Sequence, residues 1–534
     1  MRVNRLDANH YREALEIPSK KLSAVFKSVL VGAGAGAVTS FYRLALGRAE
    51  AWSFAMYDFF RGRPALIPLL FLSLAAAGYL VGALAKRFPF IRGSGIPQVK
   101  GELMGHFDAP WFSTLIAKFF GGTVSILAGL SLGREGPSIQ LGASMAKGIG
   151  QEWASSRAER RMMIAGGASA GLAAAFNAPL AGAMFAVEEI YKYLSPSLLV
   201  VILVSAMTGD FVSKLAFGLS PVFSFKTTGA VPLRLYWVLM LLGVALGGAG
   251  AVYNYALVRT QQLYRALKRL PERARPVAPF LLAGILGLIF PVVLGGGHQM
   301  LEGLKGSTTL GMLCLMFLVK FLFSMISFGS GAPGGIFFPL LILGGALGAI
   351  AAKLAGAFVE PELFDTFVVV AMAGYFAAIV RAPVTGTILL LEMTGSFDCL
   401  LPLIVVSFAA YLTADLLKSK PIYDSLLDSL LSGGASGEAC APARKIVVEQ
   451  IVHHDAPAAG RPVRDMGLPR ECLLISIRRE GEELIPSGDT VVRPGDYLTF
   501  LVNERDEGTN REALEKLTSE PESRGNSFRP YPNG

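Results

Sequence analysis

Long apolar segments separated by short polar ones run through the first four fifths of the chain. They recur near residues 25–46, 64–85, 111–132, 162–187, 196–218, 232–257, 277–295, 308–328, 336–356, 366–394 and 401–418. Each is close to the roughly 20 residues that an α-helix needs to cross the hydrocarbon core of a bilayer. The pattern predicts an all-α, polytopic membrane domain.

Glycine and proline interrupt many of these segments. The clearest interruptions are Gly93-Ser-Gly-Ile-Pro97, Gly133-Arg-Glu-Gly-Pro137 and Gly335-Ile-Phe-Phe-Pro339. A helix can break at membrane depth only where the freed backbone groups are buried in protein or line a wet cavity. We therefore expect a binding site at the breaks.

The membrane part also matches itself at a nearly constant offset. A shift of 202 residues aligns Lys118 with Lys320, Gly133 with Gly335 and Pro137 with Pro339, and a shift of 204 aligns Pro179 with Pro383 and Glu188 with Glu392. This pattern indicates an internal repeat. In transporters built from repeats with broken helices, the substrate binds near the membrane midplane at the repeat interface.

Composition and charge give the domain boundaries. Of the 534 residues, 52% are apolar or aromatic and only 17% are charged, against roughly 25% charged in soluble proteins. These values exclude an ordinary soluble enzyme and a disordered chain. Charged residues make up about 14% of residues 1–430 but about 29% of residues 431–534. We expect an N-terminal cytoplasmic segment (1–24), a membrane domain (25–430), a linker (431–444), a small soluble α+β domain (445–520) and a disordered tail (521–534).

Topology follows from the excess of basic residues in the membrane part. Lys and Arg gather in cytoplasmic loops, and the segment 259–275 contains six of them. We therefore place this loop and both termini in the cytoplasm, as in a bacterial-type inner membrane.

The three interruptions share a chemistry that suits a small anion. A helix N-terminus presents free N–H groups and a partial positive charge, so several of them aimed at one point would bind an anion. The alternative is that the glycines only let helices pack closely. Glu135 would repel such an anion when charged and withdraw when protonated, so it is a candidate gate and proton carrier. Glu188 and Glu189 either take part in proton transfer or simply lie at an ordinary cytoplasmic helix end.

The three motifs, followed by Lys420-Pro-Ile-Tyr423, resemble the CLC family of chloride channels and proton-coupled chloride exchangers. The resemblance implies a homodimer, an inverted repeat and no cofactor. It also implies that chloride is bound by the hydroxyls of Ser94 and Tyr423 and by the amides of Ile336 and Phe337. The surrounding anion cradle would be Gly93, Gly95, Ile96, Pro97, Gly133, Arg134, Gly136, Pro137, Gly335 and Pro339.

The same resemblance assigns the two acids. Glu135 corresponds to the external gating glutamate of the family, and Glu189 corresponds to the internal proton-transfer glutamate of exchangers. An acid at position 189 favours exchange of two chloride ions for one proton. A passive chloride channel is the alternative. An intramembrane enzyme is disfavoured because no nucleophile and base pair, and no metal ligand set, is visible.

The polar C-terminal part of the chain is predicted to form a separate domain. Strands are expected at 445–448, 472–478 and 496–502, and a short helix at 510–517. The stretch 468–501 resembles the RCK-C or TrkA-C domain of potassium-transport proteins. That resemblance implies dimerisation and binding of small ligands, in some relatives cyclic dinucleotides. Regulation by a nucleotide and a purely structural dimer clamp both remain open.

Overall fold

The structure is a computed structural model that describes residues 5–192, 195–219, 231–267, 271–356, 360–432, 445–469, 472–480, 482–503 and 507–519, with side chains from Leu22 onward. The expected tail 521–534 and most of the expected linker lie outside these ranges. The chain divides into two compact units, one holding nearly all of residues 1–435 and the other the C-terminal residues with Met104–Asp108.

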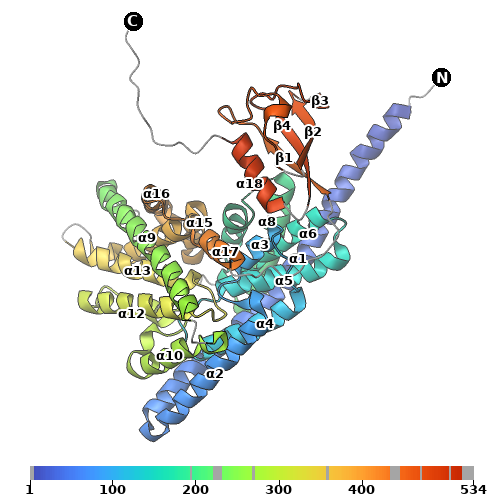
Figure 1. The fold of residues 1–534 in the computed structure, drawn as a ribbon. Coiled ribbons are helices and arrows are strands. Elements are labelled where there is room, and N and C mark those ends of the chain that lie inside the picture. The colour runs from blue at the N-terminus through green and yellow to red at the C-terminus, as the bar shows by residue number, and fades with distance from the viewer. Residues whose placement is uncertain are drawn as a thin grey trace. The chain divides into compact units, whose positions relative to one another are not determined.

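The first unit consists of helices (Figure 1). Its first half contains α1 (Arg5–Arg61), α2 (Ile67–Arg87), α3 (Ile96–Leu103), α4 (Trp111–Leu127), α5 (Glu135–Trp153), α6 (Arg157–Phe176), α7 (Pro179–Phe185), the π-helix Ala186–Tyr191 and α8 (Pro196–Phe217). Its second half contains α9 (Tyr236–Ala266), α10 (Val277–Ile289), α11 (His298–Gly303), α12 (Leu310–Gly329), α13 (Phe337–Leu354), α14 (Phe364–Val380), α15 (Pro383–Thr394), α16 (Leu400–Leu416) and α17 (Ile422–Ser432).

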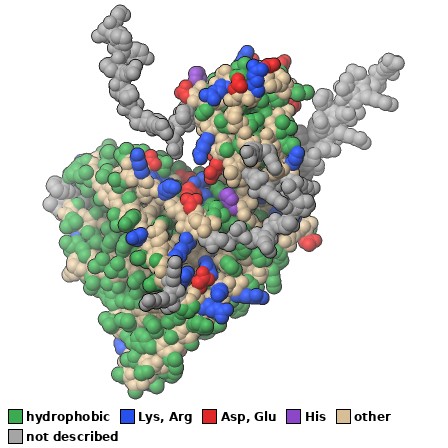
Figure 2. Space-filling model, in the orientation of Figure 1, with side chains coloured by type: hydrophobic (Ala, Val, Ile, Leu, Met, Phe, Trp, Pro, Cys, Tyr) green, Lys and Arg blue, Asp and Glu red, His purple; other side chains and the backbone are tan. Residues whose placement is uncertain are grey.

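Eight helices of the described chain are long and apolar enough to cross a membrane. They differ in how much of their surface packs inside the protein. The most apolar window of the span Pro361–Val380, which contains α14, is 94% buried, whereas that of the span Pro64–Arg87, which contains α2, is 28% buried. Hydrophobic side chains accordingly cover most of the visible face of this unit (Figure 2), as expected for a surface solvated by lipid.

Two elements differ from the sequence-based expectation. Helix α1 is continuous from Arg5 to Arg61, so the expected boundary at residue 24 falls inside one helix. Helix α5 was not among the predicted apolar segments because Gln140 and Lys147 dilute its hydrophobicity, yet both side chains are buried. Gly142 lets α5 approach α6 closely, since a Cβ there would lie 2.2 Å from the carbonyl oxygen of Gly167.

The internal repeat is visible as paired structural details. The eight helices α1–α8 correspond in order to α9–α16. In the first half, Lys118 Nζ donates to two backbone carbonyls, those of Ile91 (2.9 Å) and Gly93 (2.6 Å). In the second half, Lys320 Nζ donates to the carbonyls of Val293 (2.9 Å) and Gly295 (2.8 Å). Both lysines are fully buried, so the repeat extends to hydrogen bonds inside the core.

The two halves also cap each other. The Glu188 carboxylate accepts hydrogen bonds from the amides of Val384 (3.3 Å) and Thr385 (2.8 Å) at the start of α15. The Glu392 carboxylate accepts from the amides of Leu180 (3.0 Å) and Ala181 (2.8 Å) at the start of α7. Each acid thus satisfies free N–H groups of a helix in the other half. This reciprocal exchange indicates a two-fold relation between the repeats.

The second unit is a small α+β domain. Four antiparallel strands form a sheet in the order β1-β4-β2-β3, with β1 (Lys445–Ile451), β2 (Cys472–Arg479), β3 (Glu482–Leu484) and β4 (Tyr497–Asn503), followed by α18 (Glu507–Thr518). Leu498, Phe500 and Val502 alternate along β4 and are buried. The expected helix and three expected strands are present, and β3 was not predicted because it has only three residues.

Candidate functional site

The three Gly-rich loops meet at one place. Gly133 and Gly335 form an antiparallel bridge in which each amide donates to the other's carbonyl, both at 2.7 Å. The Gly334 amide donates to the Gly93 carbonyl at 3.0 Å. The structure therefore brings together segments that lie about 40 and 200 residues apart in sequence.

Three helices begin at this meeting point. The first residues of α3, α5 and α13 are Ile96, Glu135 and Phe337, all buried. The N-cap residues of α5 and α13, Arg134 and Ile336, make no side-chain cap hydrogen bond. The prolines at 97, 137 and 339 fall in the first turns of these helices, where a missing N–H is harmless. The loops therefore present helix N-termini to a buried point, which is the geometry of an anion site.

Glycine is needed where α5 meets the loop that carries Ser94. A Cβ at Gly136 would lie 2.3 Å from Ser94 Oγ and 2.8 Å from the Ser94 carbonyl oxygen. Gly93 and Gly95 flank this serine with φ angles of 60° and 100°, values that side-chain-bearing residues rarely adopt. The backbone of GSGIP thus turns sharply and presses Ser94 against the start of α5.

The two predicted chloride-binding hydroxyls are buried. Ser94 is 2% exposed and Tyr423 0%, and within the described chain neither oxygen has a hydrogen-bond partner. The Phe185 ring joins Tyr423 to the Phe337 ring, with centroids 6.2 Å and 5.7 Å away. A buried hydroxyl without a partner costs free energy, so each of these hydroxyls has the capacity to donate a hydrogen bond to a bound anion.

Glu135 is the first residue of α5 and is fully buried. Its Oε1 lies 3.6 Å from the Arg134 Nε. Its Oε2 fills the space above Gly133, where a Cβ would come within 2.5 Å of that oxygen. The carboxylate therefore lies beside the bridge that joins Gly133 to Gly335.

Ser94 and Glu135 line different cavities. Ser94 lines a cavity of about 540 Å³, whereas Glu135 lines a small one together with Glu50, Gly296 and His298. By the 202-residue shift, Gly296 is the counterpart of Ser94. Ser94 and Glu135 are thus reached from two separate cavities.

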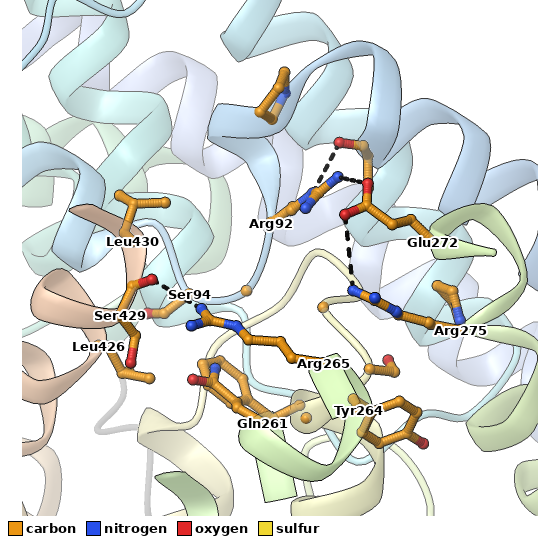
Figure 3. Close-up of a pocket in the computed structure, with 18 of the residues that line it drawn as sticks. Arg92, Ser94, Gln261, Tyr264, Arg265, Glu272, Arg275, Leu426, Ser429 and Leu430 are labelled. Atoms are coloured by element: carbon orange, nitrogen blue, oxygen red, sulfur yellow. Dashed lines mark hydrogen bonds and ion pairs between the residues drawn. The ribbon is translucent and has the colours of Figure 1, made fainter. Parts of the chain in front are cut away.

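Four cations and one acid line the larger cavity, which gives a net charge of +3 (Lys86, Arg92, Arg265, Arg275 and Glu272). Figure 3 shows Arg92 and Arg275 both paired with Glu272, at 2.9 Å and 3.8 Å, while Arg265 donates to the Ser429 carbonyl at 2.9 Å. A cavity with an excess of positive charge raises the local concentration of anions. From the sequence, Arg265 and Arg275 indicate only that their loop is cytoplasmic. Nothing in their spacing shows that they line the same cavity as Ser94.

The adjacent acids Glu188 and Glu189 have different surroundings. Glu188 caps α15, as described above. Glu189 is 1% exposed, and its Oε1 lies 2.9 Å from the Nζ of Lys100 on α3. Lys100 also binds Asp424. Sequence reasoning missed Lys100 and Asp424, although each follows a predicted motif within a few residues.

No group of three potential metal ligands occurs in the part of the chain that the structure describes. Within the described residues, Cys314, Cys399 and Cys472 form no disulfide bond, and Cys440 lies outside the described residues.

Two family models match the chain. The voltage gated chloride channel family matches residues 77–415, and the TrkA-C domain matches residues 447–514. Among curated proteins, the H(+)/Cl(-) exchange transporter ClcA of Salmonella typhimurium is 35% identical over 385 residues, which are 69% of this chain and 80% of the relative. ClcA of Vibrio cholerae is 34% identical over 426 residues, 77% of this chain and 90% of the relative.

Solved structures agree in fold. A slow cyanobacterial Cl-/H+ antiporter matches with a TM-score of 0.73 and 29% identity, covering 77% of this chain and 99% of that one. A eukaryotic CLC transporter matches with a TM-score of 0.65 and 22% identity, covering 83% and 79%. The predicted CLC fold and the predicted TrkA-C-like domain are therefore confirmed. The chain belongs to the voltage gated chloride channel (CLC) family and carries a C-terminal TrkA-C domain.

Proposed function

We propose that this protein exchanges chloride for protons across a membrane, with two chloride ions moving per proton. The main support for this proposal is the fully buried Glu135 carboxylate at the start of α5, beside the bridge between Gly133 and Gly335. The similar proteins named as chloride/proton exchangers support the same activity.

In this proposal, chloride is held by the Ser94 and Tyr423 hydroxyls and by the amides of Ile336 and Phe337. Full positive charges are absent from this set, which favours release, because conduction needs binding weak enough to let the ion leave. When ionised, Glu135 occupies the space next to these amides and excludes the anion. When protonated, Glu135 loses its attraction to the amides and opens the path on its side.

Glu189 receives the proton on the other side of the site. Glu189 is buried and is linked to the region of Tyr423 through Lys100, which also binds Asp424, the residue after Tyr423. Proton movement between Glu189 and Glu135 and chloride movement past Tyr423 would then share one region of the protein.

Purified protein in liposomes tests this proposal. An imposed chloride gradient should drive protons uphill, and Glu135→Gln should abolish proton movement while chloride still moves. Chloride flux without any proton pumping by the unmodified protein would refute exchange and leave the passive channel. If the unmodified protein moves no chloride in intact liposomes, anion transport itself is refuted.

We further propose that the protein works as a homodimer in a bacterial-type inner membrane, with both termini in the cytoplasm. The C-terminal domain supports dimerisation. Val447 and Leu473 both neighbour Leu501 on one face of the sheet, and they are 58% and 59% exposed. An apolar sheet face of this kind suits contact with a second copy.

Binding of a cyclic dinucleotide or another nucleotide is the second proposal for this domain. Equilibrium binding of labelled nucleotides to the full-length protein distinguishes regulation by a nucleotide from a purely structural dimer clamp. Saturable binding would support regulation by a ligand, and no binding across a broad panel would leave the dimer clamp.

A further inference from the structure

Four charged side chains form a connected network next to the proposed anion site. They are Lys100 on α3, Glu189 on the π-helix, Lys192 just after it, and Asp424 on α17. Lys100 Nζ lies 2.9 Å from Glu189 Oε1 and also binds Asp424 Oδ1. Asp424 Oδ2 lies 2.9 Å from Lys192 Nζ. The formal charges of the four groups add up to zero.

One end of this network is partly exposed and the other end is buried. The side chains of Lys192 and Asp424 are 40% and 32% exposed, whereas those of Glu189 and Lys100 are 2% and 0% exposed. Asp424 therefore stands between the solvent-accessible end and the buried pair. It lies beyond the last membrane-spanning helix, and although burial opposes its ionisation, the Lys100 ammonium lowers the pKa of Asp424 below its ordinary value.

The Lys100 ammonium needs a counter-charge at every step of a proton cycle. While Glu189 is ionised, two carboxylates share the ammonium. When Glu189 accepts a proton, its negative charge disappears and only Asp424 still neutralises the buried ammonium. Without Asp424, protonation of Glu189 would leave a completely buried cation unpaired, which is strongly unfavourable.

Asp424 is also adjacent to the anion site in sequence. Tyr423 and Asp424 are consecutive residues in the first turn of α17. One presents its ring to Phe185 beside the anion site, and the other presents its carboxylate to Lys100. Any displacement of this turn therefore moves both the Tyr423 ring and the Asp424 carboxylate.

We propose that Asp424 is a positioning residue for the proton half of the exchange: it keeps Lys100 neutralised when Glu189 takes up a proton, and it links that step to Tyr423. This inference rests on the proposed exchange function. The other charged or titratable neighbours are Glu188, which is bound to the start of α15, Lys192 and the Tyr423 phenol.

The inference makes opposite predictions for the two partners of Glu189. In Asp424→Asn, Glu189 becomes the only counter-charge of Lys100, so its carboxylate form is favoured and proton transport should require a lower cytoplasmic pH. In Lys100→Met, Glu189 loses its cation and lies near Asp424, so its protonated form is favoured and proton transport should persist to higher pH. Removing or adding a neighbouring charge shifts a titration by about 1–3 pH units.

The experiment measures proton and chloride fluxes of full-length protein in liposomes as a function of pH on the cytoplasmic side. Asp428→Asn is the matched control, because Asp428 lies one turn further along α17 and is exposed; its profile should equal that of the unmodified protein. Asp424→Glu should restore the profile lost in Asp424→Asn.

Shifts of the same sign in both variants, or no shift in variants that still bind chloride in the purified state, would overturn the inference. If the unmodified protein fails to pump protons, the exchange proposal itself fails. If it pumps protons and the two variants do not shift in opposite directions, only the role of Asp424 is refuted.

Discussion

Replacing Gly136 with alanine tests the arrangement of the anion site most directly. The new Cβ would lie 2.3 Å from Ser94 Oγ, 2.8 Å from the Ser94 carbonyl oxygen and 3.3 Å from Gly335 Cα. The hydroxyl could rotate away, but the backbone contacts cannot be relieved without moving the GSGIP loop or the start of α5. Either movement takes Ser94 out of the position that an anion between it and Tyr423 requires.

The expected cost is that of one hydrogen bond to a charged group, about 1.5–3 kcal/mol. This corresponds to roughly a 10- to 100-fold weaker chloride affinity, since each 1.4 kcal/mol is tenfold. Isothermal titration of chloride into purified protein measures this change. The double variant Gly136→Ala with Ser94→Ala should lose little more than Gly136→Ala alone, because the serine contribution is already absent.

Gly248→Ala is the matched control. Gly248 lies within α9, and an added Cβ meets no atom within 4 Å. This variant should bind chloride like the unmodified protein and should be stabilised slightly, because alanine is the better helix former by about 0.5–1 kcal/mol. If Gly136→Ala also binds chloride like the unmodified protein, Ser94 is not part of the anion site.

Three further predictions concern other parts of the molecule. Glu392→Gln should lower the thermal unfolding temperature in detergent, because it weakens charge-assisted caps on two amides of α7 that are worth roughly 1–3 kcal/mol; an unchanged melting curve would contradict the capping role. Arg265→Gln should lower the net charge of the large cavity and weaken apparent chloride affinity from that side a few-fold at low salt, with the effect fading at high salt. Arg234→Gln, which removes an exposed arginine paired with Glu360, should have no such effect. In the C-terminal domain, burial opposes ionisation of Asp496, but hydrogen bonds from Arg479 and the Arg493 amide lower its pKa. Its stabilising effect should be present above the ordinary aspartate pKa and disappear as the pH falls through the lowered value. Asp496→Asn should remove this part of the pH dependence of unfolding monitored by circular dichroism.

The three helix starts that meet at the Gly-rich loops could be predicted because their motifs are local. A Gly-rich loop followed by a proline marks a helix start, and the positions of Ile96, Glu135 and Phe337 at the first residues of α3, α5 and α13 follow from it. The internal repeat was also readable, since Lys118 and Lys320 keep the same spacing. These features depend on residues within about ten positions of each other or on a constant offset.

The features that sequence reasoning missed depend on contacts between distant segments. Lys100 and Asp424 lie 324 residues apart and meet only because α3 and α17 pack together. Helix α5 was missing from the predicted apolar segments for a different reason: it carries buried polar side chains, and one of them, Gln140, donates to the Phe90 carbonyl at 2.8 Å. Hydrophobicity alone cannot identify a buried helix whose polar groups find partners elsewhere in the fold.

The reciprocal caps made by Glu188 and Glu392 have a consequence for assembly. Each half of the membrane domain supplies a carboxylate that the other half needs, so neither half has complete helix ends alone. A chain cut between α8 and α9 should therefore regain its fold only when both fragments are present together. In assembly terms, the membrane domain is an intramolecular dimer whose subunits are its two repeats, and the proposed chloride site is built at the interface between them.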